Sequence, residues 1–509
     1  MHPHSQSYLR SLILNMSSQI DPVDKLVQWK KTVLRDERRD SRIRGSIEAT
    51  LEFISRRQSA LLATDDHKTV SPLSQRRSSD ISNNMTYPQI SRPFSHFPVD
   101  AYTFNNDMEK VDLQEREIEI PKPAAHDHHH ISAGPHTSKE RLKHFTFAWY
   151  AWTMSTGGVA FTISVIPNRF SGLTGLGTFL FVLNIIFFTA VTGTMITRFI
   201  VHPGTLTKAF TNPHEGFFIA TFFLTIATMI SNTTAYGVPN SGPWLITALR
   251  YAFWIYTFAA TLLAIFYYHL LFCVKKLVIT NVLPGWVLPI FPAMLVGTIA
   301  SAIGKTQPPE HAMSILVAGL SYQGLGFFIS LFMYPLYFGR LLTSGLPAYL
   351  SRPAMFIAVG PPSFTALAFI GMAQDVQETR LFEVYTDLNG ISAPNQTLIP
   401  DILSLLAILM AIFLWMLAFW AFSIAIVAMI DGIPHNDFHL NWYAKVFPNV
   451  GFTIATIKIG ERLSSPAIQL IGTGMGTVLF FALLLIMGFH IRAFFGHMIC
   501  WPGRDEDAH

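Results

Sequence analysis

Between His144 and Phe495 the sequence consists of long apolar runs separated by short polar turns. A helix needs roughly 20 residues to cross a hydrocarbon core of about 30 Å, and ten of these runs are long enough. Only 13% of the 509 residues are charged, about half the share that soluble domains carry. The chain is therefore predicted to be an all-α membrane protein with ten transmembrane helices. The predicted spans are residues 144–166, 173–199, 215–236, 243–273, 283–303, 311–339, 354–374, 399–430, 439–462 and 464–495.

The ten spans fall into five consecutive pairs, and each pair predicts a helical hairpin. We expect the hairpins to form one transport domain over residues 141–496, followed by a short cytoplasmic tail over residues 497–509. Residues 1–140 are polar and charged with little hydrophobic periodicity. This composition predicts a mostly disordered, cytoplasmic tail.

An Arg-Arg-x-Ser pattern occurs three times in the N-terminal tail. The pattern suits basophilic kinases, and a phosphate there would reverse the local charge and release the tail from an anionic membrane surface. The alternative is a solvated basic tail without a regulatory role. The candidate phosphorylation sites are Ser41, Ser59 and Ser79.

The distribution of Lys and Arg predicts the orientation of the spans, because short cytoplasmic loops carry an excess of both. With a cytoplasmic N-terminus, the inner loops hold more of these residues than the outer loops. The outer loop at 375–398 is then acidic and contains a glycosylation sequon at Asn395, which functions only outside. An even number of spans places both termini in the cytoplasm, and we expect the protein in the plasma membrane.

Alternate spans differ in a way that predicts a pore. Irregular backbone survives at membrane depth only beside water or protein, and prolines interrupt the fifth, seventh and ninth spans. The first and third spans carry clusters of Ser, Thr, Gly and Asn, with residues 153–158 at the centre of the first. We therefore expect every odd-numbered helix to be disrupted near its middle and to line a central pore. The candidate pore-lining residues are Ser155, Thr156, Gly157, Gly158, Thr228, Asn232, Pro361, Pro362, Ser363, Asn449 and Lys458. For each single Gly or Thr, close helix packing is the alternative.

The charges within the spans favour an anion as the transported species. No Asp or Glu lies in the middle of a predicted span, so a buried proton relay is not indicated. Lys445 and Lys458 on the ninth span would attract an anion, or would extend to the interface. The spans contain no catalytic or metal-ligand constellation, and the net charge of +4 is too small to suggest nucleic acid. We expect no enzymatic activity, no cofactor, no metal site and no nucleic-acid partner.

Several motifs, in order along the chain, resemble those of a known family. They are Phe145-Thr146-Phe147-Ala148-Trp149, Met154 to Gly158, Arg198-Phe199, His214-Glu215-Gly216, Gly360-Pro361-Pro362-Ser363, Phe447-Pro448 and Ile454 to Lys458. Over residues 144–495 the chain resembles the fungal malic acid transport proteins. Their family also contains the bacterial tellurite-resistance protein A and the slow-type anion channel of plant guard cells. The N-terminal tail lies outside the resemblance.

The resemblance implies ten helices in five hairpins around a central pore, and commonly a homotrimer with one pore per subunit. It also implies a phenylalanine gate on the ninth helix, where Phe447 occupies the matching position and ordinary packing is the alternative. The implied substrates are malate and related C4-dicarboxylates such as succinate and fumarate, moved by channel-like export or by proton-linked flux. Because a cousin branch exports sulfite, efflux of sulfite or another small inorganic anion is the alternative function.

Overall fold

The structure is a computed structural model that describes residues 137–274, 278–379, 381, 398–433 and 438–501. The chain divides into two units, residues 1–120 and 121–509, and every described residue belongs to the second unit. The predicted phosphorylation sites Ser41, Ser59 and Ser79 and the predicted glycosylation site Asn395 therefore lie outside the described residues. So does the predicted N-terminal tail up to residue 136.

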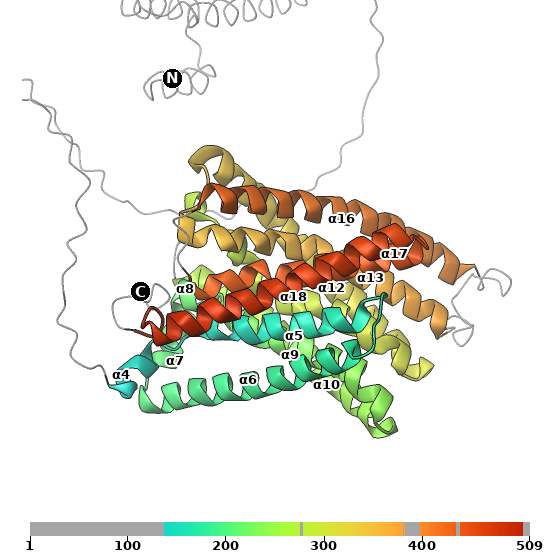
Figure 1. Ribbon diagram of the computed structural model, residues 1–509, viewed down its shortest axis with the longest axis horizontal. Helices are drawn as coiled ribbons and strands as arrows, with labels where there is room; N and C mark the ends of the chain where they lie inside the picture. Colours follow the sequence, from blue (N-terminus) through green and yellow to red (C-terminus); the bar gives the residue numbers. More distant parts are fainter. Residues whose placement is uncertain (1–136, 275–277, 380, 382–397, 434–437, 502–509) are drawn as a thin grey trace, which may run out of the picture. The chain divides into compact units, whose positions relative to one another are not determined.

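Within the described ranges the chain is helical and contains no β-strand (Figure 1). Eight helical segments of this part are long and apolar enough to cross a membrane. They are Leu173–Val201 (α6), Pro213–Asn240 (including α9, Ile219–Asn232), Pro243–Cys273 (in α10, Pro243–Val274), Pro284–Thr306 (including α11, Phe291–Ile303), Pro309–Ser344 (α12), Tyr349–Glu378 (including α13, Gly360–Glu378), Ile399–Asp431 (α16) and Pro466–Phe495 (α18).

Two further helices lie among these segments and are shorter. α5 (Tyr150–Val165) and α17 (Phe447–Arg462) have 16 residues each, which gives a length of about 24 Å at 1.5 Å per residue. A 3-10 segment precedes each one, Phe147–Trp149 before α5 and Leu440–Lys445 before α17. These two helices correspond to the first and ninth predicted spans.

The helices differ in burial. In α6, α10, α12, α16 and α18 only 22–33% of the apolar window is buried, whereas the segments that contain α9, α11 and α13 are 61%, 89% and 89% buried. α5 and α17 are also buried along most of their length. We call α5, α9, α11, α13 and α17 the inner helices and the other five the outer helices. The alternating composition of the predicted spans favours this division.

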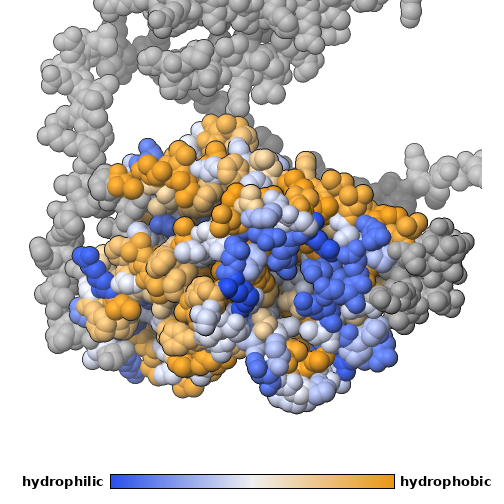
Figure 2. Space-filling model, turned by 45° about the vertical axis from the view of Figure 1, so that its right-hand side comes forward, coloured by the Kyte–Doolittle hydropathy of each residue, from blue (hydrophilic) through white to orange (hydrophobic). Residues whose placement is uncertain are grey.

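The inner helices form a closed ring. α5 packs against α9, α9 against α11, α11 against α13, and α13 against α17, which in turn packs against α5. The outer helices cover the ring: α6 packs on α5, α10 and α12 on α11, α16 on α13, and α18 on α17. Hydrophobic residues cover much of the surface seen in Figure 2, and hydrophilic residues gather in one area of it. This is the distribution that a bilayer around the outer helices requires.

Three inner helices begin with the interruption that their prolines predict. A 3-10 segment precedes each of them: Pro284–Ile290 before α11, Tyr349–Val359 before α13 and Leu440–Lys445 before α17. Each of these α-helices carries proline in its first turn, where the missing N–H costs no hydrogen bond. The regular helix therefore starts partway along each of the three segments.

The prediction of a break at the centre of the first span is wrong. α5 is regular through residues 153–158, because its hydroxyl groups bond to its own backbone instead of interrupting it. Thr153 donates to the carbonyl of Tyr150 and Thr156 to that of Trp152, both at 2.9 Å. In the third segment the irregular turn is a π-helical segment, Thr233–Gly237, that follows α9.

The two ends of the helical domain meet on one face. Arg141 Nε donates to the carbonyl of Cys500 at 3.4 Å, and Cys500 Sγ donates to the carbonyl of His144 at 3.9 Å. This contact places the segment before the first inner helix beside the end of the last outer helix.

Candidate functional site

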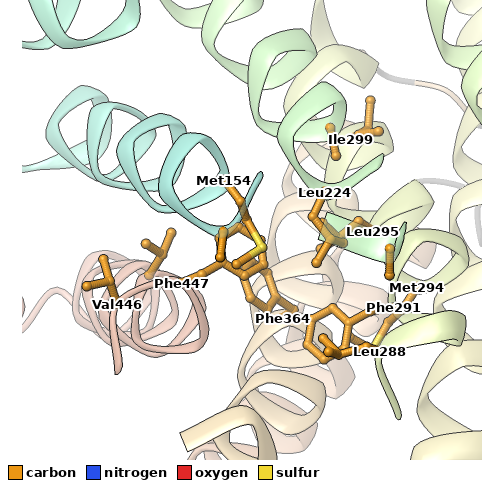
Figure 3. Packing of buried hydrophobic residues seen from close by; sticks show 14 of the residues in the cluster. Met154, Leu224, Leu288, Phe291, Met294, Leu295, Ile299, Phe364, Val446 and Phe447 are labelled. Atoms are coloured by element: carbon orange, nitrogen blue, oxygen red, sulfur yellow. The ribbon is translucent and has the colours of Figure 1, made fainter. Parts of the chain in front are cut away.

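A layer of apolar side chains fills the centre of the ring, one or more from each inner helix. Met154 of α5, Leu224 of α9, Phe291 of α11, Phe364 of α13 and Phe447 of α17 converge there (Figure 3). The rings of Phe447 and Phe364 stack with centroids 5.2 Å apart, and Phe291 meets Phe364 edge-on at 6.0 Å. We call Phe291, Phe364 and Phe447 the aromatic layer. All three side chains are at most 3% exposed.

Each ring of the aromatic layer lies against a glycine of another inner segment. A Cβ added to Gly158 of α5 would be 3.3 Å from Phe447 Cδ2, and one added to Gly451 of α17 would be 2.8 Å from Phe364 Cδ2. A Cβ on Gly360 would overlap the ring of Phe291. The aromatic layer therefore depends on missing side chains in its neighbours, which lets three large rings fit inside a narrow ring of helices.

A small cavity adjoins the aromatic layer on the side of the 3-10 segment before α17. Phe447, Phe291 and Met154 form part of its wall, together with Asn441 and Thr221 as its polar members. Its volume is about 30 Å³, room for about two water molecules. This cavity is too small for an organic anion.

Several of the predicted pore-lining residues lie near the aromatic layer. Gly158 contacts Phe447 directly, as described above, and Ser155 Oγ donates to the carbonyl of Tyr443 at 3.2 Å. Ser363 Oγ donates to the carbonyls of Gly360 (3.0 Å) and Pro448 (3.4 Å). These bonds tie α5 and α13 to the segment that carries Phe447. Three others lie close by in the chain: Thr156 follows Ser155, and Pro361 and Pro362 form the first turn of α13.

A second group of predicted residues lies where α5 packs against α9. Asn232 Nδ2 donates to the carbonyls of Gly157 and Thr228, each at 2.8 Å. A Cβ added to Gly157 would lie 2.7 Å from Nδ2 of Asn184, a fully buried residue of α6. Gly157, Thr228 and Asn232 therefore join α5 to α9.

The remaining predicted residues lie on α17 and just before it. Asn449 Nδ2 donates to the carbonyl of Lys445 at 2.7 Å, and the Lys445 ammonium lies 3.4 Å from the ring centroid of Trp442. Lys458 is about 16 Å further along the helix than Phe447, where its ammonium pairs with Glu461 at 2.9 Å. The structure thus separates Lys458 from the aromatic layer by about three helical turns.

Lys458 belongs to a cluster of charges at the end of the ring. Lys305 Nζ lies 4.0 Å from a carboxylate oxygen of Glu378, and Arg462 donates to Gln377 at 3.0 Å. Asp375, near the end of α13, is 2% exposed and lies in the same cluster. We call this cluster the charged mouth; its ionisable members are Lys305, Asp375, Glu378, Lys458, Glu461 and Arg462.

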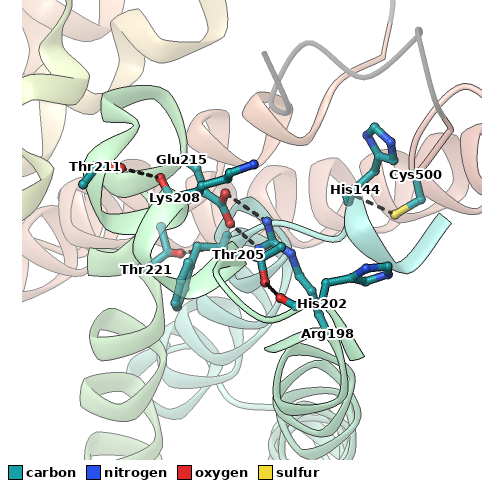
Figure 4. Close-up of polar contacts among 10 residues, drawn as sticks. His144, Arg198, His202, Thr205, Lys208, Thr211, Glu215, Thr221 and Cys500 are labelled. Carbon is teal, nitrogen blue, oxygen red and sulfur yellow. Dashed lines mark hydrogen bonds and ion pairs between the residues drawn. The ribbon is translucent and has the colours of Figure 1, made fainter. Parts of the chain in front are cut away.

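A buried ion pair holds the opposite end of the inner ring. Arg198 of α6 pairs with Glu215 through two hydrogen bonds, the longer of them 3.1 Å, and both side chains are about 5% exposed (Figure 4). A Cβ on Gly216 would overlap the hydroxyl group of Tyr267 on α10. The motifs at residues 198–199 and 214–216, separate in sequence, therefore form one contact between helices.

Sequence reasoning missed Phe291, Phe364 and Asp375. Phe364 lies four residues after Gly360, and Phe447 four residues before Gly451, so each shares a helix face with a glycine. That Phe–Gly spacing beside proline would have been the signal. Asp375 was assigned to the acidic loop at 375–398, but α13 continues to Glu378, which places Asp375 inside the helix.

Comparison with known proteins identifies relatives over the helical domain. A model of a family described as voltage-dependent anion channel matches residues 144–491. A malic acid transport protein of Schizosaccharomyces pombe is 36% identical over 379 residues, which cover 74% of this chain and 84% of the relative. A putative malic acid transport protein of the same organism is 34% identical over 371 residues, 72% of this chain and 84% of the relative.

A more distant relative is named for the efflux of a different anion, sulfite. A sulfite efflux pump of Trichophyton rubrum is 22% identical over 360 residues, which cover 69% of this chain and 92% of the relative. The similarity to the two malic acid transport proteins is therefore clearly greater.

Proposed function

The chain belongs to the voltage-dependent anion channel family, and from that premise we propose that it carries malate and related C4-dicarboxylate anions across a membrane. The relatives named for malic acid transport are 36% and 34% identical to it, against 22% for the sulfite efflux pump. This difference favours a dicarboxylate over sulfite. Efflux of sulfite or another small inorganic anion is the second candidate, because the distant relative covers the same domain.

The observation that carries the proposal is the closed ring of inner helices with the aromatic layer at its centre. In the proposed pathway the anion moves along the axis of this ring. Because the cavity beside Phe447 holds only about two water molecules, the pathway opens only when the aromatic rings move. We assign the gate to Phe447: a phenyl ring in a narrow pore excludes water and ion together until it swings aside.

The proposed architecture has ten crossings arranged as five hairpins. α5 and α17 supply the two crossings beyond the eight long apolar segments, since a 3-10 segment precedes and lengthens each one. The odd-numbered crossings are then the inner helices, which line the pore. A homotrimer with one pore per subunit completes the proposal, on the family resemblance.

The proposed orientation places both termini in the cytoplasm and the charged mouth outside, in the plasma membrane. It rests on the distribution of Lys and Arg and on the Asn395 sequon in the loop that follows α13. The domain over residues 141–496 carries out transport in this proposal, residues 497–509 form a short cytoplasmic tail, and the tail over residues 1–140 regulates transport. The proposed partner of this N-terminal tail is a protein kinase that acts on Ser41, Ser59 and Ser79.

Membrane voltage decides which direction is downhill. Each elementary charge gains or loses about 2.3 kcal/mol per 100 mV, so a dianion leaves a negative-inside cell downhill by about 4.6 kcal/mol per 100 mV. An opened pore is sufficient for export. Import against this voltage needs a proton, carried either by the substrate or by the protein.

Uptake of labelled malate into vesicles tests the proposal. The purified full-length protein is reconstituted, and voltage and pH gradients are imposed separately. We expect uptake above that of protein-free vesicles, increased by an inside-positive voltage and competed by unlabelled succinate. Uptake of sulfite that exceeds that of malate would favour the second candidate, and no uptake of either anion would contradict both.

A further inference from the structure

The charged mouth and the aromatic layer share the same helix faces. Asp375 follows Phe364 by eleven residues on α13, and Lys458 follows Phe447 by eleven residues on α17. Eleven residues make about three helical turns, so each charged residue lies on the face of its aromatic residue, about 16 Å along the axis. Because the aromatic residues point into the ring, Asp375 and Lys458 lie at the end of the same pathway.

Asp375 is the deeply buried member of the charged mouth. It is 2% exposed, and its Oδ2 atom has no hydrogen-bond partner within the described part of the chain. This oxygen lies against Gly304, where a Cβ would overlap it. A carboxylate with an unpaired oxygen is costly to bury, whereas a protonated carboxyl group is much less so. The site therefore accommodates a proton.

The groups around Asp375 come from the elements packed on α13, including α16, whose exposed Asp401 accepts a hydrogen bond from Gln377 at 3.1 Å. Lys305 contributes its ammonium group and a backbone N–H that bonds to the carboxyl group, Glu378 follows one turn later on α13, and Lys458 acts from α17. The first turn of α12 adds Glu310 and His311 at this end of the molecule. Further along α12, the apolar Leu316 lies against Gly304. Lys305 and Lys458 are held by Glu378 and Glu461 respectively.

We propose that Asp375 is a proton-binding site that controls anion binding at the charged mouth, with Lys305 and Lys458 as the anion-binding groups. The inference rests on the proposed transport of a dicarboxylate and specifies where its carboxylates first bind. Uptake of one proton converts the Asp375 carboxylate to the neutral acid, and its release restores the carboxylate.

The charges of the charged mouth explain how protonation of Asp375 would control anion binding. With Asp375 ionised, the buried carboxylate repels an anion that enters the ring. Protonation removes this buried negative charge, while Glu378 and Glu461 stay paired with Lys305 and Lys458. A dianion then binds more strongly, since the interaction between charges grows as the surrounding medium becomes less polar.

The test measures uptake of labelled malate by the reconstituted full-length protein at equal internal and external pH, between pH 7.0 and 9.0, with the voltage held at zero. Ordinary carboxyl groups titrate near pH 3.3–4.3, so the substrate stays a dianion throughout this range. For the wild type we expect uptake to fall several-fold as the pH rises.

Asp375→Asn mimics the protonated carboxyl group. We expect its uptake to be independent of pH and to match the wild type at the acidic end of the range. Asp401→Asn, the same substitution at an exposed residue of the same end, and His311→Gln should keep the wild-type dependence. Lys458→Met and Lys305→Met should each raise the malate KM several-fold at pH 7.0.

Three outcomes would overturn the inference. The first is a wild-type uptake that does not change with pH, an outcome that can be measured without any variant. The second is an Asp375→Asn uptake that depends on pH as the wild type does. The third is a pH dependence that is lost in His311→Gln. In each case malate uptake itself would remain, so the proposed function would stand. Absence of malate uptake by the wild type at every pH would instead contradict the proposed function.

Discussion

The ring of Phe447 stacks on that of Phe364, with the planes inclined by 28° and the centroids 5.2 Å apart. The two residues lie on neighbouring inner helices, and each ring lies against a glycine, Phe447 on Gly158 and Phe364 on Gly451. An aromatic pair of this kind is worth about 0.5–1.5 kcal/mol beyond its buried area. In the proposed gate, a contact of this size would favour the closed pathway and could still be broken during opening.

Removing a ring of this pair should open the pathway. We expect Phe447→Ala to raise the anion conductance several-fold, because the loss of about 1 kcal/mol of closed-state contacts shifts a two-state equilibrium roughly fivefold. Patch-clamp recording in malate, normalised to surface expression, measures the effect. Phe481→Ala, which removes a ring 62% exposed on the outer helix α18, is the control. Conductance that is unchanged in Phe447→Ala at normal surface expression would argue against the gate.

The glycine under Phe447 should be required for a stable closed state. A Cβ on Gly158 would come within 2.9 Å of Val450 Cγ2 and 3.3 Å of Phe447, and overpacking of this kind costs about 1–3 kcal/mol. We expect Gly158→Ala to lower the midpoint of thermal unfolding in detergent. Gly474→Ala is the matched control, since its Cβ would meet nothing within 4 Å. Equal midpoints for the two variants would show that the tight contact is not needed.

The buried pair of Arg198 and Glu215 should behave unlike the exposed pairs. Removing one partner leaves an uncompensated buried charge, and we expect Arg198→Met to destabilise the protein by about 3–5 kcal/mol. Changing both residues, in Arg198→Met with Glu215→Leu, should restore much of the loss. Thermal unfolding of the single and double variants measures this coupling.

A surface pair provides the comparison for this prediction. The side chains of Lys305 and Glu378 are about half exposed and 4.0 Å apart. We expect Glu378→Gln to change the free energy of unfolding by no more than about 1 kcal/mol. A double variant of Arg198 and Glu215 as unstable as the single variant would show that helix packing, and not the charge pair, is lost.

Composition was sufficient to predict which helices lie inside. Proline coincides with irregular backbone in the fifth, seventh and ninth spans, and backbone of this kind needs protein or water around it. The expected break in the first span failed for a physical reason, because Thr and Ser can satisfy their hydroxyl groups on the carbonyl three or four residues earlier without disturbing the helix. Hydroxyl groups are thus a weaker signal of irregular backbone than proline.

Contacts across the ring could not be predicted from one sequence. Gly157 and Gly158 are adjacent, yet Gly157 faces Asn184 of α6 and Gly158 faces Phe447 of α17, since successive helical residues point about 100° apart. The partners of both lie far away in the chain. The role of Asp375 was hidden in another way: an acid that follows an apolar run is read as the start of a loop, and only the helix end reveals its burial.

The reversal potential of the malate current in Phe447→Ala tests the central claim most directly, which is that the anion passes through the ring of inner helices behind the aromatic layer. With a malate gradient across the membrane, the account predicts an increased current that reverses at the equilibrium potential of the malate dianion. An increased current that reverses at the chloride or proton equilibrium potential, or no malate current at normal surface expression, would contradict it.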